Sequence, residues 1–142
     1  MCRAESPREL ATVPDTGVVY ASVGAGASHR VEEFRWDGAS LTAAGRVATI
    51  ADFNNTFPLA AMRPGAAGPW HLVVCRFGTT TTTVLELPGH RVVWEGKIPL
   101  DDKRRDAGIY GLAADPSGSA LVVCLSHGAL EAVAWPWPGL AL

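Results

Sequence analysis

Histidine and cysteine are the residue types of this chain that most often serve in catalytic or metal sites. The four histidines are His29, His71, His90 and His127. None belongs to an H-E-x-x-H or H-x-H segment, and no C-x-x-C pair is present, so the spacings typical of zinc ligands are missing. No G-x-S-x-G segment, which carries the nucleophile of many serine hydrolases, occurs either. The sequence therefore predicts no catalytic residues, no metal site and no cofactor.

Polar residues that could bind a ligand or a partner gather in short segments between apolar runs. Segment 51–56 is rich in Asp and Asn, and segment 101–107 mixes acidic and basic residues. Asx residues also stabilise turns, and charged loops are often only solvated, so both interpretations stay open. The candidate ligand- or partner-binding residues are Asp52, Asn54, Asn55, Arg104, Arg105, His29 and His127.

The composition limits the class of protein. The chain has 142 residues, of which 48% are hydrophobic and 18% charged, as expected for one folded domain. A net charge of −2 argues against a surface that binds nucleic acid or an anionic membrane. No apolar run is long enough to cross a membrane, and the first residues contain no secretory signal. We expect a cytoplasmic protein.

A repeat of about fifty residues organises the sequence. Three segments, 10–23, 59–75 and 112–124, each begin with Leu-Ala, continue through a turn rich in Pro and Gly, and end in a second apolar run. Val, Thr and aromatic residues dominate runs of four to eight residues, which is typical of strands. Cys75 and Cys124 occupy the same place in the repeat, and we expect both to be buried. The sequence predicts an all-β fold.

A four-stranded unit at this period is typical of β-propeller blades. Residues 34–38, Phe-Arg-Trp-Asp-Gly, resemble the Trp-Asp ending of the third strand in WD40 blades, and segment 18–47 is similar to lactonase-type and YVTN-type propellers. The repeat predicts three blades, at about 9–50, 57–99 and 108–142, the last without its fourth strand. In such a propeller we expect the candidate loops to meet at one mouth of a central channel, with His29 and His127 on equivalent loops.

Three blades do not close a ring, since propellers have four to eight. We expect the open flanks to be covered either by a second copy of this chain or by another chain that completes the propeller. The segment Trp135-Pro136-Trp137-Pro138 cannot continue a regular strand, so we expect an exposed aromatic docking element there. The predicted assembly residues are Trp135, Trp137, Leu140 and Leu142.

The function that these features favour is a non-catalytic binding or scaffold module that recognises protein partners. The alternative is a lactonase-like hydrolase or a lectin-like sugar-binding propeller with its site at the channel mouth. The first strands of the repeats read Leu-Ala-Thr-Val, Leu-Ala-Ala-Met and Leu-Ala-Ala-Asp, and an enzyme would need more polar groups there. Only Asp115 is available, and its neighbours Pro116, Ser117 and Gly118 indicate that it stabilises a turn.

Overall fold

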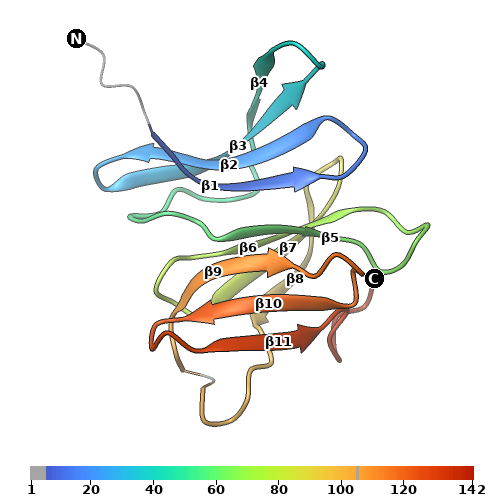
Figure 1. Ribbon diagram of the computed structural model, residues 1–142. Coiled ribbons are helices and arrows are strands. Elements are labelled where there is room, and N and C mark those ends of the chain that lie inside the picture. The colour runs from blue at the N-terminus through green and yellow to red at the C-terminus, as the bar shows by residue number, and fades with distance from the viewer. Residues whose placement is uncertain (1–5, 105) are drawn as a thin grey trace.

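The structure, a computed structural model, describes residues 6–104 and 106–142, and all regular elements in this part of the chain are antiparallel strands (Figure 1). They form three sheets, of four, four and three strands, which confirms the predicted all-β fold. Sheet A contains β1 (Ser6–Val13), β2 (Val18–Ala25), β3 (Ser28–Trp36) and β4 (Leu41–Arg46). Sheet B contains β5 (Leu59–Met62), β6 (His71–Cys75), β7 (Thr81–Glu86) and β8 (Arg91–Lys97). Sheet C contains β9 (Ile109–Ala114), β10 (Ala120–Leu125) and β11 (Leu130–Ala134). Among the described residues there is no helix long and apolar enough to span a membrane.

Local turn chemistry explains why the strands end where they do. The turn between β1 and β2 is stabilised by the Thr16 hydroxyl, which donates to the carbonyl of Val13 at 2.8 Å. Gly17 follows with φ +71°, and a Cβ there would lie 2.6 Å from the carbonyl oxygen of Trp36. Only glycine fits this position, because both the backbone angle and the close approach of β3 exclude a side chain.

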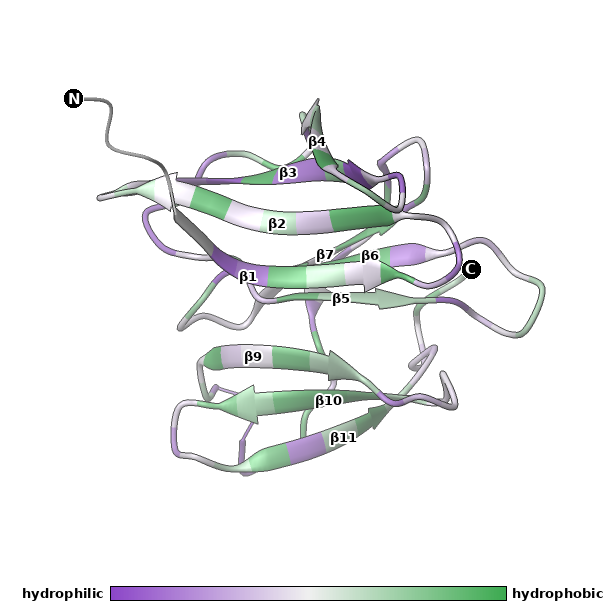
Figure 2. Ribbon diagram, turned by 45° about the horizontal axis from the view of Figure 1, so that its top comes forward, coloured by the Kyte–Doolittle hydropathy of each residue, from purple (hydrophilic) through white to green (hydrophobic). Residues whose placement is uncertain are grey.

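The three sheets lie in a row with sheet B in the middle (Figures 1 and 2). The first strands are neighbours, since β5 contacts both β1 and β9. One core cluster joins sheets A and B, and a second joins sheets B and C. All five residues of β6 are buried, because each face of sheet B packs against another sheet. Sheets A and C each have one face covered in this way.

The pairing of first and second strands is the same in all three sheets. Ala11 pairs with Tyr20, Ala60 with Val73, and Ala113 with Val122. The neighbouring pairs are Leu10–Ala21, Leu59–Val74 and Leu112–Val123. Because strand side chains alternate between faces, corresponding residues of the three sheets point toward the same neighbour in the row. The sequence repeat is therefore a repeat of register.

The carboxyl-terminal aromatic segment lies in the core, so the expectation of an exposed docking element is wrong. Trp135 and Trp137 are 6% and 2% exposed and pack between sheets B and C, where Trp137 meets Trp94 edge to face at 5.1 Å. Leu140 is buried beside them, whereas Leu142 is exposed. The two indole N–H groups have no hydrogen-bond partner among the described residues, a cost that burial of the rings offsets.

The two repeat cysteines differ in burial, which corrects the expectation that both are buried. Cys75 on β6 is fully buried and contacts the Thr82 hydroxyl at 3.2 Å. Burial raises the pKa of the Cys75 thiol to about 12. Cys124 on β10 is only half-buried, because β10 packs through Leu121, Val123 and Leu125 and leaves its other face uncovered.

We expect Cys75 to react with a thiol reagent only when the chain unfolds, because its thiol is both enclosed and protonated at neutral pH. A variant with Cys2→Ser and Cys124→Ser isolates this residue, and absorbance on reaction with a disulfide reagent measures the rate. The rate should match that of unfolding and rise steeply in urea. Labelling within the mixing time in buffer would show that sheet B is not packed on both faces.

Candidate functional site

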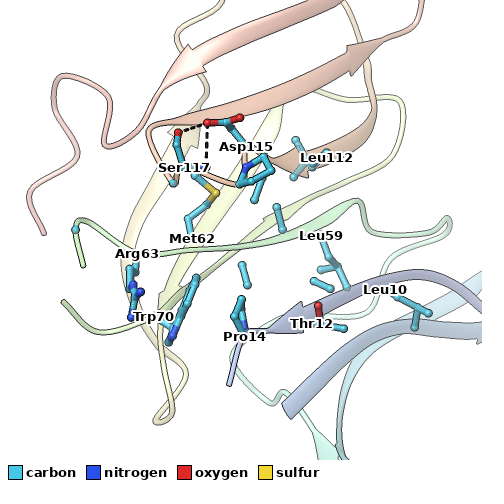
Figure 3. A pocket seen from close by; sticks show the side chains of 18 of the residues that line it. Leu10, Thr12, Pro14, Leu59, Met62, Arg63, Trp70, Leu112, Asp115 and Ser117 are labelled. Carbon is cyan, nitrogen blue, oxygen red and sulfur yellow. Dashed lines mark hydrogen bonds between the residues drawn. The ribbon is translucent and has the colours of Figure 1, made fainter. Parts of the chain in front are cut away.

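An open groove of about 580 Å³ runs along the first strands of the three sheets (Figure 3). Its walls come from β1, β5 and β9 and from the turn that follows each of these strands. Alanine, leucine, methionine and proline are most of the lining residues, and their side chains alternate with polar backbone and side-chain atoms on the walls. The groove exists because the shared register brings three short Leu-Ala strands side by side.

The polar groups of the groove lie mainly on the turns at one end. Arg63 follows β5, and its guanidinium lies over the Trp70 ring at 4.7 Å from the centroid. Asp115 and Ser117 follow β9 on the opposite wall, and Thr12 lies on β1 (Figure 3). The guanidinium is stacked on the ring face, and no hydrogen bond or ion pair joins it to another residue of segments 6–104 and 106–142, so its N–H groups can pair with a carboxylate ligand.

Asp115 has the local role predicted from the sequence. Its carboxylate accepts hydrogen bonds from the backbone N–H of Ser117, at 3.2 Å, and from the Ser117 hydroxyl. This is an Asx turn, and it orders the loop that forms one lip of the groove.

Asp52, Asn54 and Asn55 lie on the loop that leads into β5, at the opposite end of the sheets from the polar end of the groove. Asp52 pairs with Arg46 on β4. Asn55 accepts a hydrogen bond from the backbone N–H of Thr56 at 2.8 Å. Asn54 is exposed. Two of the three side chains therefore stabilise the loop itself.

The structure does not bring His29 and His127 together. His29 is buried in β3, where its backbone pairs with Phe53 and its Nε2 lies 3.2 Å from the carbonyl of Gly26. His127 is exposed on the turn between β10 and β11. The two residues belong to sheets A and C, with sheet B between them.

Arg104 anchors the loop that precedes β9 to the edge strand of sheet C. Its guanidinium lies 3.6 Å from the Glu131 carboxylate, and the same carboxylate accepts the backbone N–H of Asp101 at 2.7 Å. Arg105 lies outside the described residues. Arg104 is thus engaged in structure rather than held free for a ligand.

A buried polar cluster that the sequence did not reveal joins sheets A and B. The Tyr20 hydroxyl donates to Glu33 at 2.8 Å and lies 2.8 Å from Nε2 of His90, on the turn between β7 and β8. Arg35 contacts the other Glu33 oxygen at 3.1 Å. His90 has φ +61°, and its carbonyl accepts the Thr49 hydroxyl. Hydrogen bonds on both its backbone and its ring thus hold this turn against sheet A.

The cluster changes the ionisation of its members. Burial and then the hydrogen bond to Glu33 raise the pKa of Tyr20. Burial alone would raise the pKa of Glu33, but the hydrogen bonds from Tyr20 and Arg35 outweigh it and hold that pKa below its usual range. Glu33 is therefore ionised at neutral pH and serves as a charged acceptor that fixes sheet B against sheet A.

In the described part of the chain, no group of three His, Cys, Asp or Glu side chains is close enough to hold a metal ion. Sequence reasoning missed Arg63 and Trp70 because it placed the binding face at the other end of the sheets. One signal could have indicated the groove. Met62 and Asp115, which line the groove, share one repeat position with the buried Val13, and the residue types at this position differ where the flanking turns stay alike.

Glu33 gives stability that depends on pH. Its pKa is lower in the folded chain than in the unfolded chain, so its contribution is fully present above the ordinary glutamate pKa of 4.5 and is lost as the pH falls through the lowered pKa. Glu33→Gln should therefore lose less unfolding free energy than the wild type over that interval, measured in urea at each pH. Glu95→Gln, at an exposed position, is the matched control. Equal losses in the wild type and Glu33→Gln would contradict the assignment.

The comparisons with known proteins leave the family open. No family model matches this chain, and the search of curated proteins found no significant match.

Proposed function

We propose that the three sheets are blades of a β-propeller unit and that this unit is a non-catalytic module that binds a segment of a protein partner. Two observations support the propeller arrangement. The sheets are successive antiparallel meanders of the same register, and their first strands lie beside one another. Both are features of blades arranged around a channel, in which the first strand of each blade is innermost.

The groove along β1, β5 and β9 is the observation that carries the binding function. Its volume of about 580 Å³ is in the range of known ligand sites, and its walls offer apolar contact along their length. The side chains of four lining alanines are short and leave space in the groove for an extended segment with apolar side chains. These alanines are Ala60, Ala61, Ala113 and Ala114. Arg63, stacked on Trp70, would pair with an acidic group of that segment.

A library of displayed random peptides, selected on the full chain, tests this function. Enriched peptides should combine apolar residues with Asp or Glu, and fluorescence anisotropy of one labelled peptide gives its Kd. Ala114→Trp fills the groove and should weaken binding by roughly tenfold or more. Ala44→Trp, on the exposed strand β4, should leave the Kd unchanged.

A second pair of variants tests the acidic preference. Arg63→Gln should weaken peptides that carry a carboxylate and leave their amide analogues unaffected, because only the charged pair is lost. Arg91→Gln, outside the groove on β8, is the control. Equal binding to the wild type, Ala114→Trp and Arg63→Gln, or no peptide enriched over a blank surface, would overturn the proposed site.

A further inference from the structure

Two sheet faces of this chain pack against no other sheet in the described structure. The uncovered face of sheet C, called face C here, carries Ala113, Val122, Cys124, Leu130 and Ala132. None of these five side chains is charged, and β10 is hydrophobic along its length (Figure 2). Leu130 is 65% exposed. Face C is thus an apolar sheet surface open to solvent in the single chain.

The face of sheet A with no sheet against it, called face A here, carries Leu10, Val19, Ala21 and Phe34, together with the charged Arg30 and Glu32. Val19 and Phe34 are partly exposed, whereas Ala21 is already buried among its neighbours on the face. Leu10 is 64% exposed, whereas Leu59, at the same register position in sheet B, is 3% exposed. The difference arises because the face of sheet B that holds Leu59 packs against sheet A, while face A has no sheet against it.

Face C repeats a surface that is packed elsewhere in the chain. Ala113 pairs with Val122, and Val122 with Ala132, as Ala60 pairs with Val73 and Val73 with Val84 in sheet B. The three sheet B residues are buried in the cluster that joins sheet B to sheet C. Face C therefore has the position and the chemistry of a surface that receives the next sheet in the row.

Face A repeats the complementary surface. Val19 pairs with Phe34 as Leu72 pairs with Leu85 in sheet B, and both leucines are buried against sheet A. At the two internal contacts, Tyr20 shares a core cluster with Leu72, and Val73 shares one with Leu121. The corresponding pair across an intermolecular contact is Val122 of one copy and Val19 of another.

We propose that face C of one copy docks on face A of a second copy, and that two such contacts close a ring of six sheets. The ring rests on the proposed propeller arrangement. Each chain carries both halves of one type of contact, and a head-to-tail contact must either close or grow into a filament. Two copies give six sheets, within the range of closed propellers, whereas three copies would give nine.

The charged residues of face A are compatible with this contact. Glu32 on face A pairs with Arg30 at 2.7 Å. Its register equivalent in sheet C is Glu131, because Glu32 pairs with Ala21 and Glu131 with Val123. Glu131 lies on the side of sheet C that faces sheet B, with its side chain 14% exposed and paired with Arg104. An internal contact of this chain thus already accepts a paired glutamate at that position.

Docking would also complete the groove. Its outer walls are β1 and β9, which belong to sheets A and C and border the two uncovered faces. In the ring, β9 of one copy would lie beside β1 of the other, as β5 lies beside β1 within the chain. The half-open groove of each copy would then become one side of a shared channel.

Light scattering on the purified chain at micromolar concentration tests the ring directly. We expect a mass of about twice the 14.9 kDa of one chain. Val122→Glu places a charge on face C and should give the mass of one chain. Val92→Glu, the same substitution on the exposed outer strand β8, should keep the double mass.

Charge complementation tests whether the two faces meet head to tail. Val19→Lys on face A should also give the mass of one chain. Mixing the Val19→Lys and Val122→Glu variants should restore the double mass, since in a mixed ring one contact pairs Lys with Glu and the other is unaltered. Contacts between identical faces would not be restored by mixing. Restoration also shows that both variants are folded.

Labelling of Cys124, which lies on face C, measures the contact at residue level. In a Cys2→Ser, Cys75→Ser chain, reaction should slow at least tenfold as the protein concentration rises through the dimer range, and should stay fast in Val122→Glu. A single-chain mass with concentration-independent labelling, or open-ended oligomers, would overturn the ring. If the protein has the mass of one chain but still binds peptides in the groove, the ring is wrong and the proposed function stands. If the double mass is found but Ala114→Trp does not change the Kd for peptides, the ring stands and the proposed binding site is wrong.

Discussion

Burial of sheet B on both faces is the constraint on which the rest of the described structure depends. A strand that alternates polar and apolar side chains can cover only one neighbour, whereas β6 is apolar at both sets of positions except for His71. His71 is buried too, and its Nδ1 lies 2.9 Å from the carbonyl of Pro69. Burial lowers the pKa of His71, which keeps the ring neutral in this setting. Sheet B can therefore separate two cores rather than cover one.

Two-sided packing fixes the place of the first strands. With sheets A and C against sheet B, β1 and β9 must lie on either side of β5, and small residues let the three backbones approach. The polar cluster of Tyr20, Glu33 and His90 then fixes the A–B contact through residues that do not line the groove. Apolar packing sets the order of the sheets, and the cluster adds directional bonds that a slipped register would break.

The strand content and its division into four, four and three strands were predictable, because the repeat couples β-branched runs to turns at fixed places. Burial was less predictable. Cys75 and Cys124 share a repeat position, yet only Cys75 has a sheet on its side. Trp135 and Trp137 leave the strand pattern, as the prolines require, but Trp137 packs onto Trp94 and Trp135 packs onto Trp137. The Tyr20–Glu33–His90 cluster joins residues far apart in the sequence, and no short spacing signals such a contact.

The groove and the uncovered faces have a common origin in the repeat. The apolar run that is buried on both sides in sheet B has solvent on one side at the same register in sheet C, and in sheet A the missing neighbour leaves Leu10 exposed. The groove is lined mostly by apolar residues because its walls are the first strands of those same sheets. It is open because the described chain has no further sheet whose first strand could lie opposite β5. Covering face C with a face of matching register would bury face C and enclose the groove.

Binding in the groove and assembly through the faces would then be coupled, because a segment held between β1 and β9 would contact both copies. A partner that fits the closed channel would bind the ring more tightly than the single chain, and by linkage would stabilise the ring by the same factor.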